Sequence, residues 1–343
     1  ERAPELFVHC GDAIYADDPI PPSIALPDGG VWTNVVTAAK TRVAETLDDF
    51  RGAFLYPRES REVRALSAAV PLLSIWDDHE VHNNWFPGQM LEDERYAERR
   101  VAVLAERARR ARAEHLPTLH EPHTPMFRAV PWGPLLEIFL VDGRSYRTPN
   151  HPEPPAARFF GDVQRAWLEE ALTRSRAVWK VVACDMPIGL VVAEPAPGGG
   201  LAFDGIANTD GAPAGREQEL ARLFATLRAR DVRNVVWVTA DVHYASALRY
   251  DPGRARFRDM LPFWELVAGP MHAGSFPRKP LDDTFGPELV WASAGPDTFG
   301  SPATGAQSFG LVRIDGRTAV LTVTFVDSRG RDLHQLSLQP ERH

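Results

Sequence analysis

The sequence has few cysteines, few lysines and no long apolar run. Its two cysteines, Cys10 and Cys184, can form at most one bridge, so disulfide bonds do not determine its stability. The lysines are Lys40, Lys180 and Lys279, which leaves 38 − 3 = 35 arginines, the side chain best shaped to hold phosphate with two hydrogen bonds. With no run of about 20 apolar residues and no signal peptide ahead of the first motif, the sequence predicts no transmembrane segment.

The charge balance excludes one class of partner. The chain has 46 acidic and 38 basic residues, a formal net charge of -8, so no global positive field attracts nucleic acid. We therefore expect no stable nucleic-acid complex, and any anionic substrate must be held by local groups. A length of 343 residues fits two domains of about 150 residues, or one large α/β or α+β domain with insertions.

The hydrophobic pattern predicts alternating strands and helices. Nearly continuous apolar segments predict strands that are buried on both faces, as in an α/β sheet. Near the C-terminus the pattern changes to a β-hairpin over residues 311–325, followed by one more strand at 333–338. The Pro- and Gly-rich residues 187–215 predict a long irregular connection. Predicted strands are 5–10, 71–76, 135–141, 178–183 and 234–239, and predicted helices are about 34–55, 91–114, 161–174 and 215–230.

Three of the predicted strands end in side chains that bind metals. In an open α/β sheet, ligands bind outside the carboxyl ends of the strands, so we expect clusters from distant parts of the chain to meet there. Carboxylate, imidazole and phenolate groups together suit iron, manganese, zinc or calcium. The three clusters are Asp12 with Tyr15, Asp78 with His79 and Asn83, and Asp241 with His243.

Each cluster also has an ordinary structural explanation. Asp12 is typical of a turn after a strand, and Tyr15 is typical of a packed aromatic. Asp241 and His243 are as typical of a core or turn pair as of a metal site. Residues 77–80, Asp-Asp-His-Glu, are harder to explain as a solvated loop, because three adjacent carboxylates repel one another unless cations neutralise them. Their shared position at strand ends favours a metal site.

The motifs follow one another in an order that resembles a known family. They are GDAIYAD at residues 11–17, WDDHE at 76–80 with Asn83 and Asn84, and TADVHY at 239–244. The family is the alkaline phosphatase D (PhoD-like) branch of the calcineurin-like metallophosphoesterases. Weaker similarities lie at residues 142–147, 210–216, 265–270 and 307–310, so that the resemblance covers nearly the whole chain.

The resemblance implies a fold, a cofactor and a location. It implies an α/β protein, a four-layer α/β/β/α sandwich with a C-terminal β-hairpin region, in which residues 1–343 form a single catalytic domain. It also implies two or more metal ions, Fe³⁺ with Ca²⁺ in the first place and otherwise Mn²⁺ or Zn²⁺. Members of the family are commonly exported, which implies an extracellular or periplasmic location.

The resemblance also implies a role for each matching residue. In that family and in the related purple acid phosphatases, the GDxxY aspartate bridges two metals and the tyrosine binds ferric iron. These roles pass to Asp12 and Tyr15. Asp78 matches a ligand of the second metal, and His79 matches the residue that contacts the phosphoryl group or the leaving oxygen. The other expected metal contacts are Asn83, Asp241 and His243.

The chain departs from the family at its start. A PhoD-like protein normally has a small N-terminal β domain and then a strand with a cysteine or equivalent metal ligand before GDxxY. Because this chain begins at Glu1, almost directly on a strand, we expect that upstream residues are missing. Cys10 lies on the same face of its strand as Asp12 and is a candidate replacement, although it is also typical of a small buried hydrophobe. Asp185 is a second candidate, or a turn residue.

The function that follows is a metal-dependent phosphoric ester hydrolase, an alkaline phosphatase or phosphodiesterase. A metal-activated hydroxide would attack phosphorus in line, and His79 would stabilise or protonate the departing alkoxide. Asp77 or Glu80 would orient His79. Arg144 and Arg147 are candidates for a clamp on the phosphate oxygens, although arginines near acidic sites more often form structural ion pairs.

Two alternatives remain open. A phospholipase-D-like or phosphotriester hydrolase on the same fold would use the same motifs, so the substrate is a small phosphate ester or a phospholipid. The connection at 187–215 and residues 271–302, with Phe285, Trp291 and Phe299, would then supply an apolar rim, although such aromatics are more often ordinary packing. A homologue that binds calcium or phosphate without catalysis is the other alternative, supported by the missing upstream ligand.

Overall fold

The chain divides into two compact units, Glu1–Met126 and Phe127–His343. The computed structural model describes residues 2–26, 28–117, 124–151, 154, 156–196, 198–295, 300–304 and 306–341. None of the helices in this part of the chain is long and apolar enough to cross a membrane. The aromatic Phe299 of the predicted apolar rim lies outside the described residues.

The first unit is built on a short parallel sheet of β1 and β4. The two strands run in register from Phe7 opposite Leu72 to Cys10 opposite Ile75, so their carboxyl ends lie next to each other. Around them, α1 and α3 contribute to one apolar core. The elements are β1 Phe7–Cys10, β2 Ser23–Ala25, β3 Val31–Thr33, η1 Ala38–Lys40, α1 Leu47–Leu55, η2 Tyr56–Glu59, α2 Arg61–Ala69, β4 Leu72–Ile75 and α3 Val101–His115.

Two helices of this unit are shorter than the sequence predicted. The helix expected over residues 34–55 begins only at Leu47, because Thr46 and Asp49 form a capping box that fixes the N-terminus there. The helix expected over 91–114 is α3, which begins at Val101. Residues 90–100 instead form a loop closed by a hydrogen bond from the Leu91 amide to the Arg99 carbonyl, at 2.8 Å. Helix α2 was not predicted.

The second unit contains a mixed seven-stranded sheet in the order β13-β11-β12-β10-β7-β6-β5. Strands β6, β7, β10 and β12 are parallel, and the others pair antiparallel. The elements are β5 Arg128–Trp132, β6 Leu136–Leu140, α4 Gly161–Arg174, β7 Trp179–Ala183, β8 Ala193–Pro195, β9 Leu201–Phe203, α5 Glu217–Ala229, β10 Val235–Thr239, β11 Ser246–Tyr250, β12 Phe263–Val267, β13 Pro287–Ala292, η3 Pro302–Thr304, β14 Ser308–Ile314, β15 Leu321–Asp327 and β16 Asp332–Leu338.

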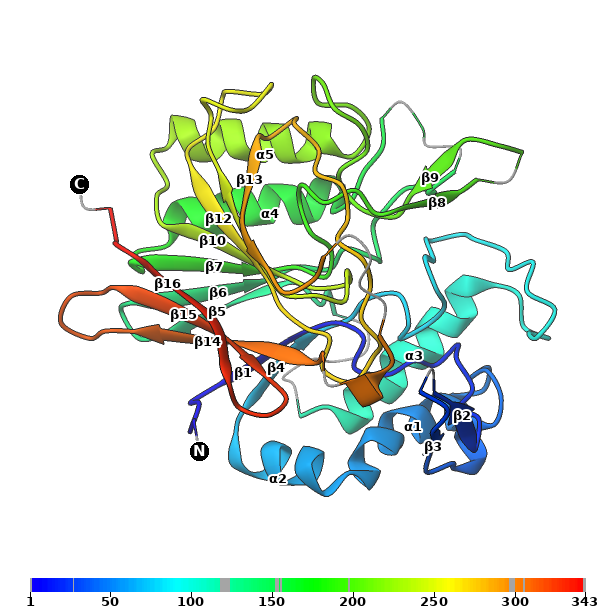
Figure 1. Cartoon of the computed structure of the whole chain (residues 1–343). Helices are drawn as coiled ribbons and strands as arrows, with labels where there is room; N and C mark the ends of the chain where they lie inside the picture. Colours follow the sequence, from blue (N-terminus) through cyan, green and yellow to red (C-terminus); the bar gives the residue numbers. More distant parts are fainter. Residues whose placement is uncertain are drawn as a thin grey trace. The chain divides into compact units, whose positions relative to one another are not determined.

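Both faces of the seven-stranded sheet are buried, which explains the unbroken apolar runs in its strands. On β10, Trp237 belongs to the core shared with α4 and α5, and its neighbour Val236 belongs to the core shared with β15. Figure 1 shows α4 and α5 side by side along the sheet and β14–β16 as a separate antiparallel sheet. The second unit is therefore an α/β/β sandwich, which confirms the predicted α/β sandwich class and the C-terminal hairpin.

The boundaries in the second unit agree closely with the sequence pattern. Helix α4 has the predicted limits, and α5 differs by two residues at its start and one at its end. The connection at 187–215 is less irregular than predicted, because it contains the hairpin of β8 and β9. Strands β5, β11, β12 and β13 were not predicted.

Candidate metal centre

The loops that follow β1 and β4 approach each other closely in the first unit. Gly11 follows β1 with φ +100°, and a Cβ atom built on it would lie 2.4 Å from Cβ of Asp77, which follows β4. Only glycine tolerates both this backbone conformation and this contact. Two of the three predicted clusters therefore meet, as the parallel strands require.

Glu80 joins the two loops. Its carboxylate accepts hydrogen bonds from the amides of Asp12 at 3.0 Å, Ala13 at 2.7 Å and Asp77 at 2.8 Å. The side chain is buried, and burial raises its pKa although these amides favour the charged form. We expected Glu80 or Asp77 to orient His79; Glu80 instead holds the backbone of the two loops.

The side chains of Asp12, Asp78 and His79 converge above these loops. Each offers a ligand atom, and these atoms lie within 4.8 Å of one another. Asp78 is buried and held in place by the amides of His79 and Asn84, at 3.0 and 2.7 Å. The Tyr15 hydroxyl donates to Oδ2 of Asp12 at 3.2 Å. Oxygen and nitrogen donors at this spacing fit a borderline or hard metal ion.

The buried carboxylate of Asp17 orients His79. Both carboxylate oxygens of Asp17 lie 2.9 to 3.0 Å from Nδ1 of His79, and the Asn83 amide donates to Oδ2 at 2.7 Å. The ring of Tyr15 lies 4.4 Å from the imidazole, centre to centre. The sequence argument gave this orienting role to Asp77 or Glu80 because they adjoin His79, whereas Asp17 is 62 residues away. A catalytic role for Asp77 stays a prediction.

The electrostatic environment of His79 favours its charged form when no metal is bound. Burial disfavours the imidazolium. The negative charges of Asp78 and Asp12, and the hydrogen bond to Asp17, outweigh burial and raise the pKa of the imidazole to about 11. The same field attracts metal cations, and a bound cation would cancel part of it.

Asn83 has an exposed side chain, and its backbone amide binds Asp17. Its neighbour Asn84, which was quoted only as part of the motif, has a left-handed backbone with φ 56° and binds Asp78 through its amide. The side chain of Asn83 as a metal ligand therefore stays a prediction.

The third cluster follows β10 in the second unit. His243 Nδ1 lies 2.8 Å from the carbonyl oxygen of Gly274, and the ring of Phe276 stacks on the imidazole at 4.5 Å. Donation from Nδ1 to a carbonyl places the lone pair on Nε2, the arrangement typical of metal-binding histidines. That Asp241 and His243 complete one centre with the residues of the first unit stays a prediction.

Three of the predicted ligands, and Asn84 next to a fourth, have a strained backbone conformation. Non-glycine residues rarely have positive φ, and where they do, the surrounding structure must hold them there. Such strain is commonly found at functional sites, so it supports a site at the ends of β1, β4 and β10. The residues are Asp12, Asn84, Asp241 and His243, with φ of 54°, 56°, 66° and 61°.

Arg144 does not have the geometry of a phosphate clamp. Its guanidinium is fully buried and forms two hydrogen bonds with Asp204, at 2.9 and 2.7 Å. Arg147 binds the same carboxylate at 2.6 Å and lies over the ring of Phe159. The arginines hold the pKa of Asp204 well below its usual range against the effect of burial. The structure therefore replaces the expected clamp with a structural ion pair.

The two candidates for the missing upstream ligand differ in their surroundings. Asp185, after β7, is fully buried; its Oδ1 accepts from the Gly143 amide at 3.2 Å and its Oδ2 lies 3.7 Å from Nε of Arg144. Burial outweighs the arginine and raises its pKa to about 6. With these contacts Asp185 has the surroundings of a structural carboxyl group. Cys10 is half-buried in β1, and a ligand role for it stays a prediction.

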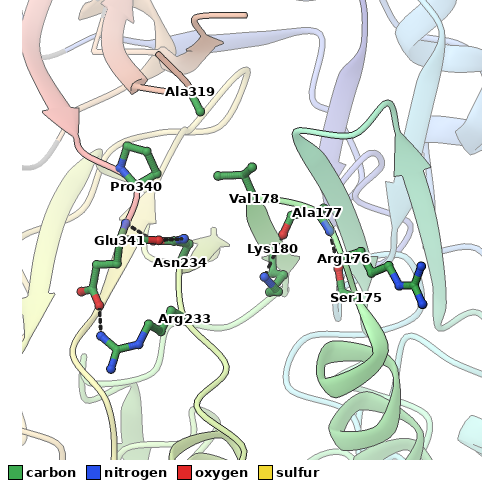
Figure 2. A pocket seen from close by; sticks show the side chains of 10 residues that line it. All are labelled: Ser175, Arg176, Ala177, Val178, Lys180, Arg233, Asn234, Ala319, Pro340 and Glu341. Atoms are coloured by element: carbon green, nitrogen blue, oxygen red, sulfur yellow. Dashed lines mark hydrogen bonds and ion pairs between the residues drawn. The ribbon is translucent and has the colours of Figure 1, made fainter. Parts of the chain in front are cut away.

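A pocket in the second unit lies away from these strand ends. It has a volume of about 520 Å³ and lies where β7 and β10 begin, opposite the carboxyl edge (Figure 2). In this pocket Glu341 forms an ion pair with Arg233 and a hydrogen bond with Asn234. The ion pair already neutralises the charge of the Arg233 guanidinium. Its lining is Ser175, Arg176, Ala177, Val178, Lys180, Arg233, Asn234, Ala319, Pro340 and Glu341.

The fold and the strand-end clusters define an α/β protein with the features of a metallophosphoesterase. A family model described as PhoD-like phosphatase matches residues 1–325, and the chain belongs to this family. Alkaline phosphatase D of Bacillus subtilis (strain 168) is 29% identical over 268 residues, which cover 72% of this chain. The match covers 43% of that protein, so the chain spans less than half the length of this curated relative.

A solved structure described as "Structure of PhoD" has the same fold. It superposes with a TM-score of 0.62 over 97% of this chain and 67% of that chain, at 19% sequence identity. This likeness supports the fold. The match to the family model confirms the family resemblance inferred from the motifs.

Proposed function

We propose that this chain carries the catalytic centre of a metal-dependent phosphoric ester hydrolase, an alkaline phosphatase or phosphodiesterase. The observation that carries the proposal is the convergence of Asp12, Asp78 and His79 at the ends of two parallel strands, with ligand atoms within 4.8 Å. The PhoD-like family and the relative named alkaline phosphatase D agree with it. Secretion of the protein is part of the same proposal.

The donor set fits the proposed metals. Carboxylate oxygens, a tyrosine and imidazoles are the ligands of Fe³⁺ with Ca²⁺, and of Mn²⁺ or Zn²⁺. Metal ions bound there supply charge neutralisation for the phosphoryl oxygens and lower the pKa of bound water from 15.7 to about 7. We assign the metals to Asp12, Tyr15, Asp78, Asn83, Asp241 and His243.

His79 supplies the proton for the departing alkoxide. Asp17 accepts the Nδ1 proton, which leaves Nε2 to donate to the leaving oxygen. The ring is partly exposed, with 20% of its side chain accessible, so a substrate can reach it. Cations bound beside Asp12 and Asp78 would reduce the field that holds the pKa near 11, bringing His79 closer to the pH at which proton transfer is efficient.

A phospholipase-D-like or phosphotriester hydrolase is a second candidate. The observation that favours it is Phe276, which is 41% exposed and stacks on His243, a predicted metal ligand. An exposed ring at that position would contact an aryl or acyl group of the substrate. A homologue that binds metal without catalysis is the third possibility.

The test is the metal content and activity of the full-length protein. We expect at least two metal ions per chain, visible absorption from a tyrosinate on ferric iron, and hydrolysis of bis-p-nitrophenyl phosphate or p-nitrophenyl phosphate. Phosphatidylcholine tests the second candidate. Asp78→Asn should reduce both metal content and activity, and Asp259→Asn, an exposed acid paired with Arg228, is the matched control. Metal binding without any esterase activity would leave only the non-catalytic alternative.

A further inference from the structure

A second acidic cluster lies in the second unit, in segments that the proposed mechanism does not use. Asp210 belongs to the connection between β9 and α5, and Asp282 and Asp283 precede β13. Their carboxylates offer oxygens within 4.8 Å of one another. Surface acids often gather without binding anything, so the cluster alone is not a site.

A fourth carboxyl group makes this cluster unusual. Glu217, the first residue of α5, is 1% exposed, and Asp282 is 2% exposed. Burial, and then the negative charge of Asp282, raise the pKa of Glu217 to about 8. Oε1 of Glu217 and Oδ2 of Asp282 are both buried and receive no hydrogen bond from an N–H or O–H donor within the described part of the chain, and the two carboxyl groups face each other. We call Asp210, Glu217, Asp282 and Asp283 the acidic quartet.

Each of the two buried carboxyl groups accepts an amide hydrogen bond, Glu217 from Ala214 at 3.1 Å and Asp282 from Thr284 at 2.7 Å. An amide does not neutralise a buried carboxylate, so something else must do so. Among the described residues, Arg256 donates to Asp283 at 2.8 Å and has 64% of its side chain exposed. A shared proton would neutralise one carboxyl of the buried pair and would leave the remaining carboxylates facing each other. A divalent cation neutralises two charges and can accept oxygens from Asp210, Asp282 and Asp283, while Glu217 lies next to Asp282.

We propose that the acidic quartet binds a calcium ion. Calcium accepts six to eight oxygen ligands at about 2.3 to 2.6 Å in flexible geometry, so ligand oxygens up to about 4.8 Å apart fit one coordination shell. Magnesium requires a near-ideal octahedron and keeps more of its waters, which suits oxygens from two loops and a helix less well.

The ion would fasten three segments of the second unit together. The loops already exchange hydrogen bonds, from the Asp283 amide to Asp210 and from the Gly211 amide to Asp283, each at 2.9 Å. The connection that carries Asp210 also carries Asp204, the partner of Arg144. The role is therefore structural, and no member of the quartet belongs to the candidate metal centre.

Calcium binding can be measured in a chain whose candidate centre has been disabled. In the Asp78→Asn/Asp241→Asn background we expect equilibrium dialysis with calcium chloride to give one ion per chain, and Asp282→Asn to abolish it. Calcium at 100 times its dissociation constant should raise the Tm by roughly 5 to 10 °C. Glu194→Gln, which removes a charge from strand β8, is the matched control and should change neither result. In the wild-type chain, Asp282→Asn should lower the calcium stoichiometry by one.

The outcomes separate this proposal from the hydrolase. Because the background lacks two ligands of the candidate centre, the result does not depend on catalysis. If Asp282→Asn does not fold, Asp283→Asn, at the more exposed end of the quartet, should still weaken calcium binding about tenfold or more. Calcium that remains bound after both substitutions overturns the proposal. The proposal is also overturned if the folded Asp78→Asn/Asp241→Asn chain binds no calcium and Glu217→Gln raises its Tm. That result would mean that a shared proton neutralises Glu217 and Asp282.

Discussion

Two loops at the carboxyl ends of strands both carry buried carboxylates, but the groups that bind these carboxylates differ. After β4, in the first unit, Asp78 and Glu80 are held by backbone amides, and Asp17 holds the imidazole of His79. After β6, in the second unit, Arg144 and a neighbouring arginine pair with a single buried carboxylate. In the first loop uncharged backbone amides orient the acids; in the second, arginines pair with the acid and the charges cancel.

The difference teaches how to distinguish a functional cluster from a structural one. Amide donors fix a carboxylate without neutralising it, so its field remains available to a metal or to His79. A bidentate arginine both fixes and neutralises its partner and gives a rigid, inert contact. Charge-bearing motifs alone do not reveal which case applies.

Removing the imidazole should have the largest effect. We expect His79→Ala in the full-length protein to lower kcat by about 100 to 10,000-fold while metal content is unchanged, because in the proposed mechanism the residue transfers a proton and does not hold the metal. Asp17→Asn should lower kcat by about 10 to 100-fold and shift the pH profile, since the ring keeps its place but loses the carboxylate. Equal losses of metal and kcat in His79→Ala would make His79 a ligand instead.

Breaking the neutralised cluster should act on stability instead. Arg144→Met leaves the buried carboxylate of Asp204 with one arginine fewer, and we expect unfolding free energy to fall by about 3 to 5 kcal/mol. Denaturant melts measure this. The KM of the folded fraction should stay unchanged, and Asp204→Asn in the same chain should recover part of the loss. A large rise in KM with normal stability would restore the phosphate-clamp role.

The sequence predicted those parts of the fold that depend on local pattern. Continuous apolar strands such as 178–183 and 234–239 are buried on both faces, and the turn at 315–316 joins two antiparallel strands. The helix at 34–55 was overextended because the signal that begins it, the capping box of Thr46 and Asp49, lies inside an otherwise helix-compatible segment.

The partners within the site were harder to predict, because they are distant in sequence. Asp12, Asp78 and His79 were found from motifs at strand ends, and the parallel pairing of β1 and β4 brings them together. Asp17 occurs in the quoted GDAIYAD motif, but only the fold places it on His79. Arg144 pairs with Asp204, which is 60 residues away, so no local sequence pattern predicts this ion pair.

The contact that brings the first-unit loops together can be tested by a matched pair of glycines. Gly11→Ala places a methyl group 2.4 Å from Asp77 Cβ at φ +100°, and we expect a loss of about 3 kcal/mol or more. Gly88→Ala, at φ +81° with nothing within 4 Å, should cost about 1 to 2 kcal/mol from the backbone alone. Similar losses in thermal melts of the two variants would mean that the close approach of the loops contributes nothing.

The smallest effect concerns a carboxyl group for which burial outweighs a neighbouring arginine. Asp185 has a pKa of about 6 in the folded chain against an ordinary 3.8, so between these pH values the folded state binds more protons than the unfolded state. Its contribution is therefore fully present below about pH 3.8 and is lost as the pH rises through 6. Asp185→Asn removes this titration, and the stability difference between variant and wild type should change by about 1 to 3 kcal/mol across that window. Urea melts at pH 4, 5, 6 and 7 measure it, and parallel curves would show that the arginines, not burial, control the second-unit cluster throughout.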